Sequence, residues 1–274
     1  MTTNTATGFS PTSSRSTADD IALAGRQILY DQRSFWRNRS RAFFAFLLPI
    51  MFLVIFGSLN RGDTLEHRGD IAADLFIVPG LLAYGLIMAT FTNLATDLAI
   101  SRESGVLKRM RGTPLPRWAF LSGRIGSATL TAMAVTVVTL MVGGLAYDVH
   151  VRLETLPGLV LGLAFGTACF SALGIGVNRL IPNADAAPAV ANGLILPLTF
   201  ISGVWGDFGP LPTSLQRLAE TFPIQHLANA LQVAFDPRTA GPGIVWSDLL
   251  NLTVWGALGV LAGLRWLHRD QLHD

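Results

Sequence analysis

Long runs of apolar residues alternate with short polar segments along this chain. A stretch such as AFFAFLLPIMFLVIFGSL has no polar face, whereas the helices of a soluble bundle keep one side polar. A helix needs about 20 mostly apolar residues to cross a membrane. The pattern therefore predicts six transmembrane helices, at Ala42–Leu59, Leu75–Ile100, Phe120–Ala146, Leu156–Val177, Ala186–Val204 and Leu249–Trp266.

Composition favours the same interpretation over a soluble helical bundle. Of the 274 residues, 50% are hydrophobic and only 14% are charged, against about 25% charged residues in soluble domains. The predicted fold class is all-α, a polytopic membrane protein. The single cysteine, Cys169, lies in the fourth predicted span, so neither a disulfide framework nor a cysteine metal cluster is expected. We expect no metal and no cofactor on this chain.

The N-terminal segment is rich in Ser and Thr and has no signal-peptide pattern. We expect a disordered tail over residues 1–18, one transmembrane domain over 19–268, and a short C-terminal tail over 269–274. Most of the 20 Lys and Arg residues fall on one side of the membrane if the N-terminus is cytoplasmic. Because such residues tend to stay in the cytoplasm, both termini are predicted to be cytoplasmic.

An amphipathic helix is predicted just before the first span. Apolar and aromatic positions, including Phe35 and Trp36, follow a helical rhythm, and Arg26 and Arg33 lie on the other face. Such a helix lies in the membrane interface, where its aromatic rings sink and its arginines meet lipid headgroups. The alternative is a simple charged stop before the first span.

The only lysine and several arginines gather in RESGVLKRMRGTPLPRW, residues 102–118. One interpretation is that these charges only fix the topology. The internal pattern predicts more, because Ser101 is placed to cap a short helix that carries Glu103 in its first turn. Apolar residues then lie opposite Lys108 and Arg109, which predicts a short amphipathic helix on the cytoplasmic face.

The sequence RESGVLKRMRGTPLPRWAFLSGRI, which leads from one span to the next, resembles the cytoplasmic loop of ABC-2 type transporter permeases, particularly the daunorubicin-resistance type of drug exporter. In that family, Arg-Glu-x-Gly is followed by a basic helix and a Thr-Pro turn. The resemblance covers nearly the whole chain, including Pro49 in the first span and LPLTFISGVW in the fifth. It implies the membrane subunit of an exporter of hydrophobic drug-like or lipid-like compounds in a bacterial plasma membrane.

In that family the loop rests against a separate ATPase subunit, which binds ATP and Mg. The match implies that the same contact is made here by Arg102, Glu103, Gly105, Leu107, Lys108, Arg109, Arg111, Thr113 and Pro114. It also implies a second permease, which is a copy or a paralogue, together with contacts to membrane lipids. No nucleic-acid partner is expected.

The chain itself lacks a standard ATP-binding loop. A Walker A loop ends in Lys followed by Ser or Thr, because the lysine and the backbone amides hold the phosphates. The only lysine, Lys108, is followed by Arg109. If ATP drives transport, another polypeptide must hydrolyse it, and this chain is predicted not to be an enzyme.

Two helical pieces are predicted in GPLPTSLQRLAETFPIQHLANALQVAF, between the fifth and sixth spans. Each is too short to cross a hydrocarbon core of about 30 Å, and Pro223 suits the first turn of the second piece. The predicted topology places both in the outer leaflet. A lone histidine among apolar residues, such as His226, is more often structural than a ligand or a proton relay.

Ionisable residues within spans are usually functional. Asn93 and Asp97 lie one turn apart near the end of the second span. Asp97 either serves the transport pathway or lies at the interface, paired with Arg102 or another arginine. The pathway candidates are Pro49, Asn93, Asp97, Pro197, Ser202 and Gly203. The span centres are otherwise nearly free of charge, which counts against a proton-driven antiporter or an ion channel.

Two rival functions stay open at this point. Related families of the same architecture export polysaccharides or lipid-linked glycans, for which a wider, aromatic-lined pathway is expected. An intramembrane lipid-modifying enzyme would need convergent polar groups at membrane depth. Asp97 and Asp185 show no recognisable catalytic spacing, and we predict no catalytic residues.

Overall fold

The structure is a computed structural model that describes residues 17–65, 70–106, 109, 112, 116–206 and 212–269. The two predicted tails lie outside these residues, except for helical residues at 17, 18 and 269. Helices dominate the described part of the chain, and its only strands form a small antiparallel hairpin. The predicted class of a helical polytopic membrane protein is confirmed.

The elements follow one another in a simple order along the chain. They are α1 (Thr17–Arg37), α2 (Arg39–Leu59), β1 (Thr64–Leu65), β2 (Ile71–Ala72), α3 (Asp74–Ile87), the π-helix η2 (Met88–Thr92), α4 (Asn93–Glu103), α6 (Arg117–Tyr147), α7 (Leu156–Gly176), the short η3 (Val177–Arg179), α8 (Ala187–Ile201), α9 (Thr213–Thr221), α10 (Pro223–Gln232) and α11 (Trp246–Arg269).

Five helical stretches are long and apolar enough to cross a membrane. They correspond to every predicted span except the fifth, and they comprise Arg39–Leu59, Asp74–Glu103, Trp118–Tyr147, Leu156–Arg179 and Trp246–Arg265. The second stretch is continuous through α3, η2 and α4. The π-helix in its middle was not predicted from the sequence.

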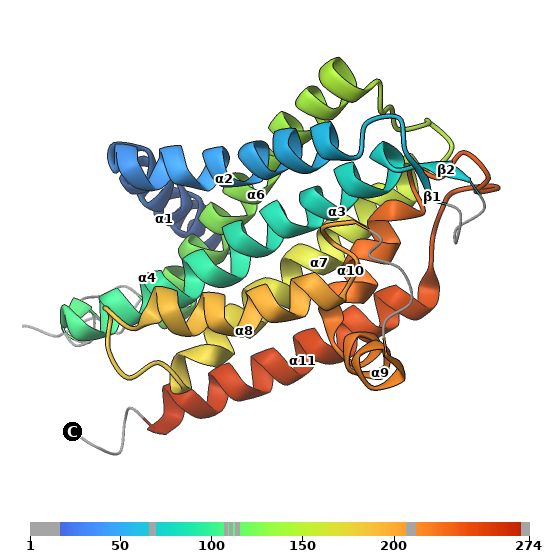
Figure 1. The fold of residues 1–274 in the computed structure, drawn as a ribbon. Helices are drawn as coiled ribbons and strands as arrows, with labels where there is room; N and C mark the ends of the chain where they lie inside the picture. Colours follow the sequence, from blue (N-terminus) through green and yellow to red (C-terminus); the bar gives the residue numbers. More distant parts are fainter. Residues whose placement is uncertain are drawn as a thin grey trace, which may run out of the picture.

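The fifth predicted span is shorter than expected. α8 has 15 residues, which at about 1.5 Å per residue fall short of a core of about 30 Å. The predicted end at Val204 is wrong, because the helix ends at Ile201 and the chain turns at Gly203, whose φ is +68°. Figure 1 shows α8 running beside α3 and α4.

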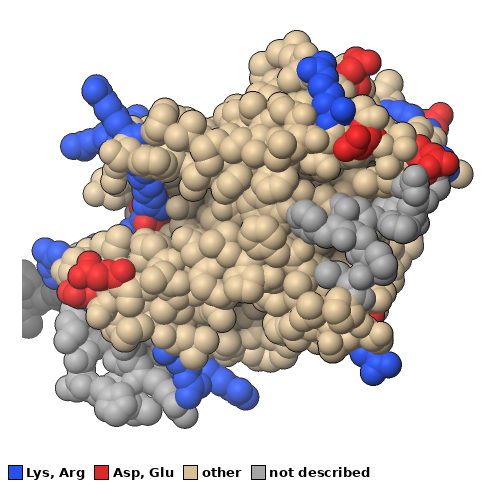
Figure 2. Space-filling view, in the orientation of Figure 1, with Lys and Arg blue, Asp and Glu red and all other residues tan. Residues whose placement is uncertain are grey.

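The bundle has two ends, which we name by their residues (Figure 1). At the Arg102 end, α4 finishes and α6 begins, and at the Trp205 end, α3 begins and α9 and α10 lie. Figure 2 shows that, among the described residues of the visible face, charged side chains gather at these ends and uncharged residues cover the region between them. Such a belt suits contact with lipid tails.

The second membrane-crossing stretch forms the centre of the bundle. Of its apolar window, 83% is buried inside the molecule, against 22% for Arg39–Leu59 and 28% for Trp246–Arg265. α3 packs against α2, α6 and α10, and η2 packs against α6 and α7. The helices around it therefore keep apolar surface for lipid or for other membrane helices.

Glycine allows the closest helix contact, between α7 and α11. A Cβ atom added at Gly259 would lie 2.7 Å from the backbone carbon of Ala172 and 2.7 Å from the backbone nitrogen of Leu173. Backbone atoms cannot move aside as a flexible side chain can. Small residues thus let these two helices approach closely, as is common between membrane helices.

The short helices α9 and α10 are fastened onto the bundle. Pro223 begins α10, as predicted, and Leu227 and Leu231 on its apolar face are fully buried. The Nδ1 atom of His226 lies 2.7 Å from a carboxylate oxygen of Asp248 in α11, and its Nε2 lies 2.9 Å from the Glu220 carbonyl oxygen. His226 therefore joins α9, α10 and α11.

We predict that Gly259→Ala destabilises the protein by about 1–3 kcal/mol, the usual cost of overpacking a close-packed site. The matched control is Gly193→Ala in α8, where an added Cβ meets nothing within 4 Å. Because alanine is the better helix former, the control should be neutral or slightly stabilising. Reversible unfolding in mixed micelles measures both variants, and equal effects would contradict the proposed close approach.

Candidate functional site

The Arg-Glu-x-Gly segment lies where α4 ends. The prediction that Ser101 caps a new helix is wrong, because α4 continues through Ser101 to Glu103. Gly105 has a φ of +71°, the left-handed conformation that commonly follows a helix C-terminus. The Arg109 amide donates to the Gly105 carbonyl oxygen at 3.0 Å.

Arg102 and Glu103 both bind the chain between α7 and α8. The Arg102 guanidinium donates to the carbonyl oxygens of Ile181 at 2.7 Å and Pro182 at 3.1 Å. A Glu103 carboxylate oxygen accepts the backbone N–H of Ala184 at 2.5 Å. These contacts form what we call the α4 clamp, and they are charge-assisted, which makes them stronger than neutral hydrogen bonds.

The rest of the predicted coupling set is only partly placed. Arg109 is exposed, and its guanidinium donates to the Ser104 carbonyl oxygen at 3.1 Å. The other predicted coupling residues lie outside the described residues, and they are Leu107, Lys108, Arg111, Thr113 and Pro114.

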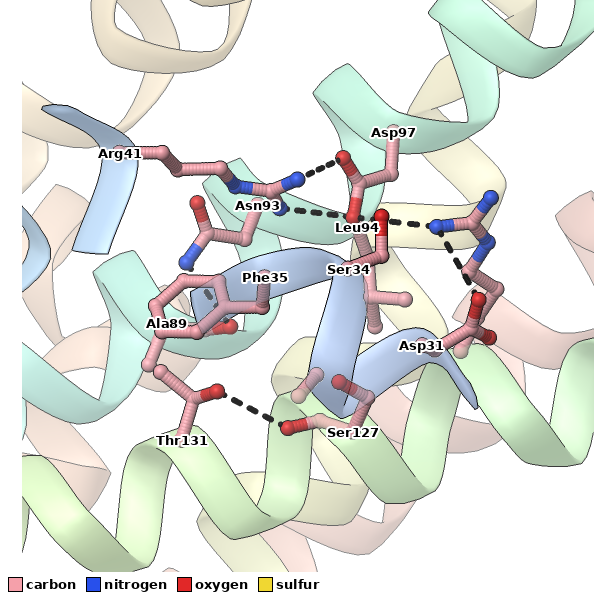
Figure 3. Close-up of a pocket in the computed structure, with 12 residues that line it drawn as sticks. Asp31, Ser34, Phe35, Arg41, Ala89, Asn93, Leu94, Asp97, Ser127 and Thr131 are labelled. Atoms are coloured by element: carbon pink, nitrogen blue, oxygen red, sulfur yellow. Dashed lines mark hydrogen bonds and ion pairs between the residues drawn. The ribbon is translucent and has the colours of Figure 1, made fainter. Parts of the chain in front are cut away.

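Asp97 lies in a cluster of charged groups that joins four helices. The Arg41 guanidinium binds both carboxylate oxygens of Asp97, at 2.6 and 2.7 Å. Arg124 of α6 lies 3.7 Å from Asp97 and 3.6 Å from Asp31 of α1, and it also donates to the Ser101 hydroxyl at 3.2 Å. Figure 3 shows Arg41, Asp97 and Asp31 converging from separate helices. We call these four charged residues the Asp97 cluster.

The Asp97 cluster suits a structural link better than a ligand pocket. The cavity beside it has a volume of about 20 Å³, enough for one water molecule but far below a drug-sized site. Burial raises the pKa of Asp31 above its ordinary value, with Arg124 opposing this effect and Asp97 adding to it. Of the two predicted interpretations of Asp97, the structure shows the paired one, with Arg41 and Arg124 as the partners instead of Arg102.

The predicted amphipathic helix is present as α1, and it packs along α6. Phe35 is buried beneath the Arg41 guanidinium, which lies 5.4 Å from its ring centre. Trp36, Arg26 and Arg33 are exposed. One side of α1 is therefore docked on the bundle, while the other side presents both aromatic and basic groups.

The predicted pathway residues do not form one site. Asn93 lines the small cavity beside Asp97, at the Arg102 end. Ser202 and Gly203 form the turn after α8, at the Trp205 end. Pro49 is buried in α2, and Pro197 is exposed on α8. The six candidates are thus divided between opposite ends and separate helices.

An aromatic cluster at the Trp205 end escaped the sequence analysis. The Trp205 ring is buried among four others, with ring centres between 4.7 and 5.3 Å away, and these belong to Phe52, Phe56, Tyr84 and Phe200. Its indole N–H donates to the Thr199 hydroxyl at 2.9 Å. The only sequence signal was a tryptophan directly after the fifth predicted span.

Among the described residues, no group of three or more His, Cys, Asp or Glu side chains is arranged to hold a metal ion. The partners of Asp97, Arg41 and Arg124, also escaped the sequence analysis, because the pattern around Asp97 does not identify which arginine lies against it. A charge near a span end is a signal that a partner exists, but it does not name that partner.

Comparisons with known proteins give a consistent result. The family model described as ABC-2 type transporter matches residues 21–235. The chain is 23% identical over 251 residues to the putative transport permease YvfS of Bacillus subtilis, which covers 90% of this chain and 97% of YvfS. It is 24% identical over 183 residues to the probable multidrug ABC transporter permease YbhR of Escherichia coli, covering 65% of this chain and 48% of YbhR.

We predict that Arg124→Gln destabilises the protein by about 3 kcal/mol, the lower end of the cost of breaking a buried ion pair, because it leaves Asp31 without its cation. The double variant Asp31→Asn/Arg124→Gln should regain part of this loss, since no unpaired charge is then buried. The measurement is reversible unfolding in mixed micelles.

The control is Arg179→Gln, at an exposed position of the same end, which should change stability by less than about 0.5 kcal/mol. A double variant no more stable than Arg124→Gln would argue against the link between Asp31 and Arg124.

Proposed function

The chain belongs to the ABC-2 type transporter family, and we propose that it is the permease subunit of an ATP-driven exporter in a bacterial plasma membrane. It is a membrane transport component. In this proposal it moves a hydrophobic drug-like or lipid-like compound out of the cell, and both of its termini are cytoplasmic. The observation that carries the proposal is the α4 clamp, which joins the Arg-Glu-x-Gly segment to the chain between α7 and α8.

We propose that a separate ATPase subunit, which binds ATP and Mg, docks on residues 102–116. The absence of a Walker A sequence from this chain supports a separate hydrolysing subunit. Arg109 is exposed and the sequence of the segment is basic, and complementary charge favours docking of an acidic partner surface. A second permease, identical or paralogous, completes the complex.

Movement at the docking segment would reach several helices at once. The α4 clamp ties it to the chain that enters α8, because Arg102 and Glu103 bind carbonyl and amide groups there. The Asp97 cluster ties the same helix to α1, α2 and α6. We propose that closure of the ATPase dimer pushes these parts together, tilting α2, the α3–α4 stretch and α8.

The uncharged middle of the bundle supports the proposed substrate class. Charged side chains gather at the two ends of the visible face in Figure 2, and a charged compound would find few partners between them. A hydrophobic or amphipathic compound entering from the lipid meets apolar, aromatic and hydroxyl groups. The name of the multidrug permease YbhR is consistent with such a substrate.

We predict that Lys108→Glu/Arg109→Glu reduces recovery of the bound ATPase at least about tenfold, because like charges across an interface cost several kcal/mol. The tagged chain is purified from its native membrane in mild detergent, and bound proteins are quantified by mass spectrometry. Arg217→Glu, an exposed position on α9 at the opposite end, is the matched control and should retain the ATPase. Recovery of the chain alone in several detergents would refute the proposal.

A second prediction separates docking from coupling. Glu103→Ala removes the carboxylate that accepts the Ala184 amide, so the ATPase should remain bound while transport falls about tenfold or more, the cost of a lost charge-assisted bond of roughly 1.5–3 kcal/mol. Uptake of a hydrophobic dye into inside-out vesicles measures transport. Glu154→Ala, which changes an exposed acid at the other end, should transport normally, and full transport by Glu103→Ala would overturn the coupling role.

A further inference from the structure

A cavity of about 270 Å³ opens at the Trp205 end, between α10 and the start of α3. It is more than ten times larger than the cavity beside Asp97. One wall is apolar and comes from Ile71, Leu75, Phe76 and Val233. The opposite wall is polar and comes from Asn229, Gln232, Asp236 and Arg238.

The two amide side chains of this cavity present acceptors. The Asn229 amide nitrogen donates to a carboxylate oxygen of Asp248 at 2.5 Å, and the Gln232 nitrogen donates to the carbonyl oxygen of Gly203 at 3.3 Å. Carboxylate and carbonyl oxygens only accept, so these partners fix which end of each amide is nitrogen. Both side chains line the cavity, and with the nitrogens assigned in this way the other polar atom of each is a carbonyl oxygen, which accepts.

Asp236 adds a carboxylate to the same cavity. The hydrogen bonds from the Arg238 side chain, more than any other cause, hold the pKa of Asp236 below its ordinary value. One carboxylate oxygen accepts two Arg238 N–H groups at 2.9 and 3.0 Å, and the other accepts one at 2.9 Å. A carboxylate offers about four lone-pair sites, so the second oxygen keeps capacity for another donor.

The cation on the rim does not close the cavity to a positive ligand. The Arg238 side chain is 53% exposed, and ion pairs exposed to water are weak. The Arg152 guanidinium is already engaged with the backbone carbonyl oxygens of Asp236 and Thr239. The polar lining therefore offers acceptors at positions 229 and 232 of α10 and at position 236, after the turn that follows α10. A ligand that fits needs hydrogen-bond donors at one end and an apolar body at the other.

We propose that this cavity binds a protonated amine with an apolar body, its ammonium group facing Asn229, Gln232 and Asp236. An ammonium group carries donors and no acceptor, which matches a wall of acceptors. The apolar body packs against Leu75, Phe76 and Val233. The volume suits a small amphipathic molecule. This inference goes beyond the proposed export function and does not depend on it, because the permease alone forms the cavity.

The test is equilibrium binding of monodansylcadaverine, a fluorescent primary amine, to the full chain in phosphatidylcholine nanodiscs, with empty nanodiscs as the blank. The neutral N-butyl dansylamide, which lacks the amine, is the matched probe. We expect the amine to bind the wild type more tightly than the neutral probe. Asp236→Asn should weaken amine binding about tenfold, a change typical of losing one charge-assisted contact, and should leave the neutral probe unchanged.

The control variant is Asp148→Asn, which removes an acid whose side chain is 98% exposed and whose φ of 55° asparagine tolerates. It should bind the amine as the wild type does. Val233→Phe fills the cavity while Asp236 stays in place, and it should abolish binding of the amine. Equal binding of the two probes, equal effects of Asp236→Asn and Asp148→Asn, or unchanged binding to Val233→Phe would overturn the proposal.

Discussion

The position of Arg124 between two carboxylates governs the assembly of the Arg102 end. Asp31 and Asp97 are both largely removed from water, and an uncompensated charge in such surroundings costs several kcal/mol. With Arg41 as the second cation, the cluster carries two charges of each sign. Helices α1, α2, α4 and α6 must meet at this point, because each supplies one of its members, and the docked side of α1 follows from that requirement.

The two ends of the bundle are held together by different forces. At the Arg102 end, charged side chains bind one another and the backbone between α7 and α8. At the Trp205 end, four aromatic rings surround Trp205, and the buried face of α10 fills the space between α3, α7 and α11. The charged end is where the proposed ATPase would dock, whereas the aromatic end is closely packed around Trp205 and borders the cavity beside α10.

Five of the six spans predicted from the apolar runs are long helices in the structure. A run of about 20 apolar residues can be recognised from consecutive positions alone. The amphipathic rhythm of α1 and the start of α10 at Pro223 were equally local and equally readable. Local signals failed at the ends of two helices, α4 and α8. Ser101 resembled a helix cap but lies within α4, and the apolar run through Val204 continued past Gly203, whose positive φ ends the helical geometry.

The sequence by itself determined the class of protein, the helical segments, the family resemblance and the lack of a standard ATP-binding loop, since each depends on residue types in consecutive positions. It also indicated that Asp97 needed a partner. Only the tertiary structure chose Arg41 and Arg124 from among many arginines, divided the pathway candidates between two ends, and brought Asn229, Gln232 and Asp236 to the same cavity as Leu75 and Phe76 of α3. Arg41 and Asp97 are 56 positions apart, and no local pattern encodes a contact that arises from how whole helices pack.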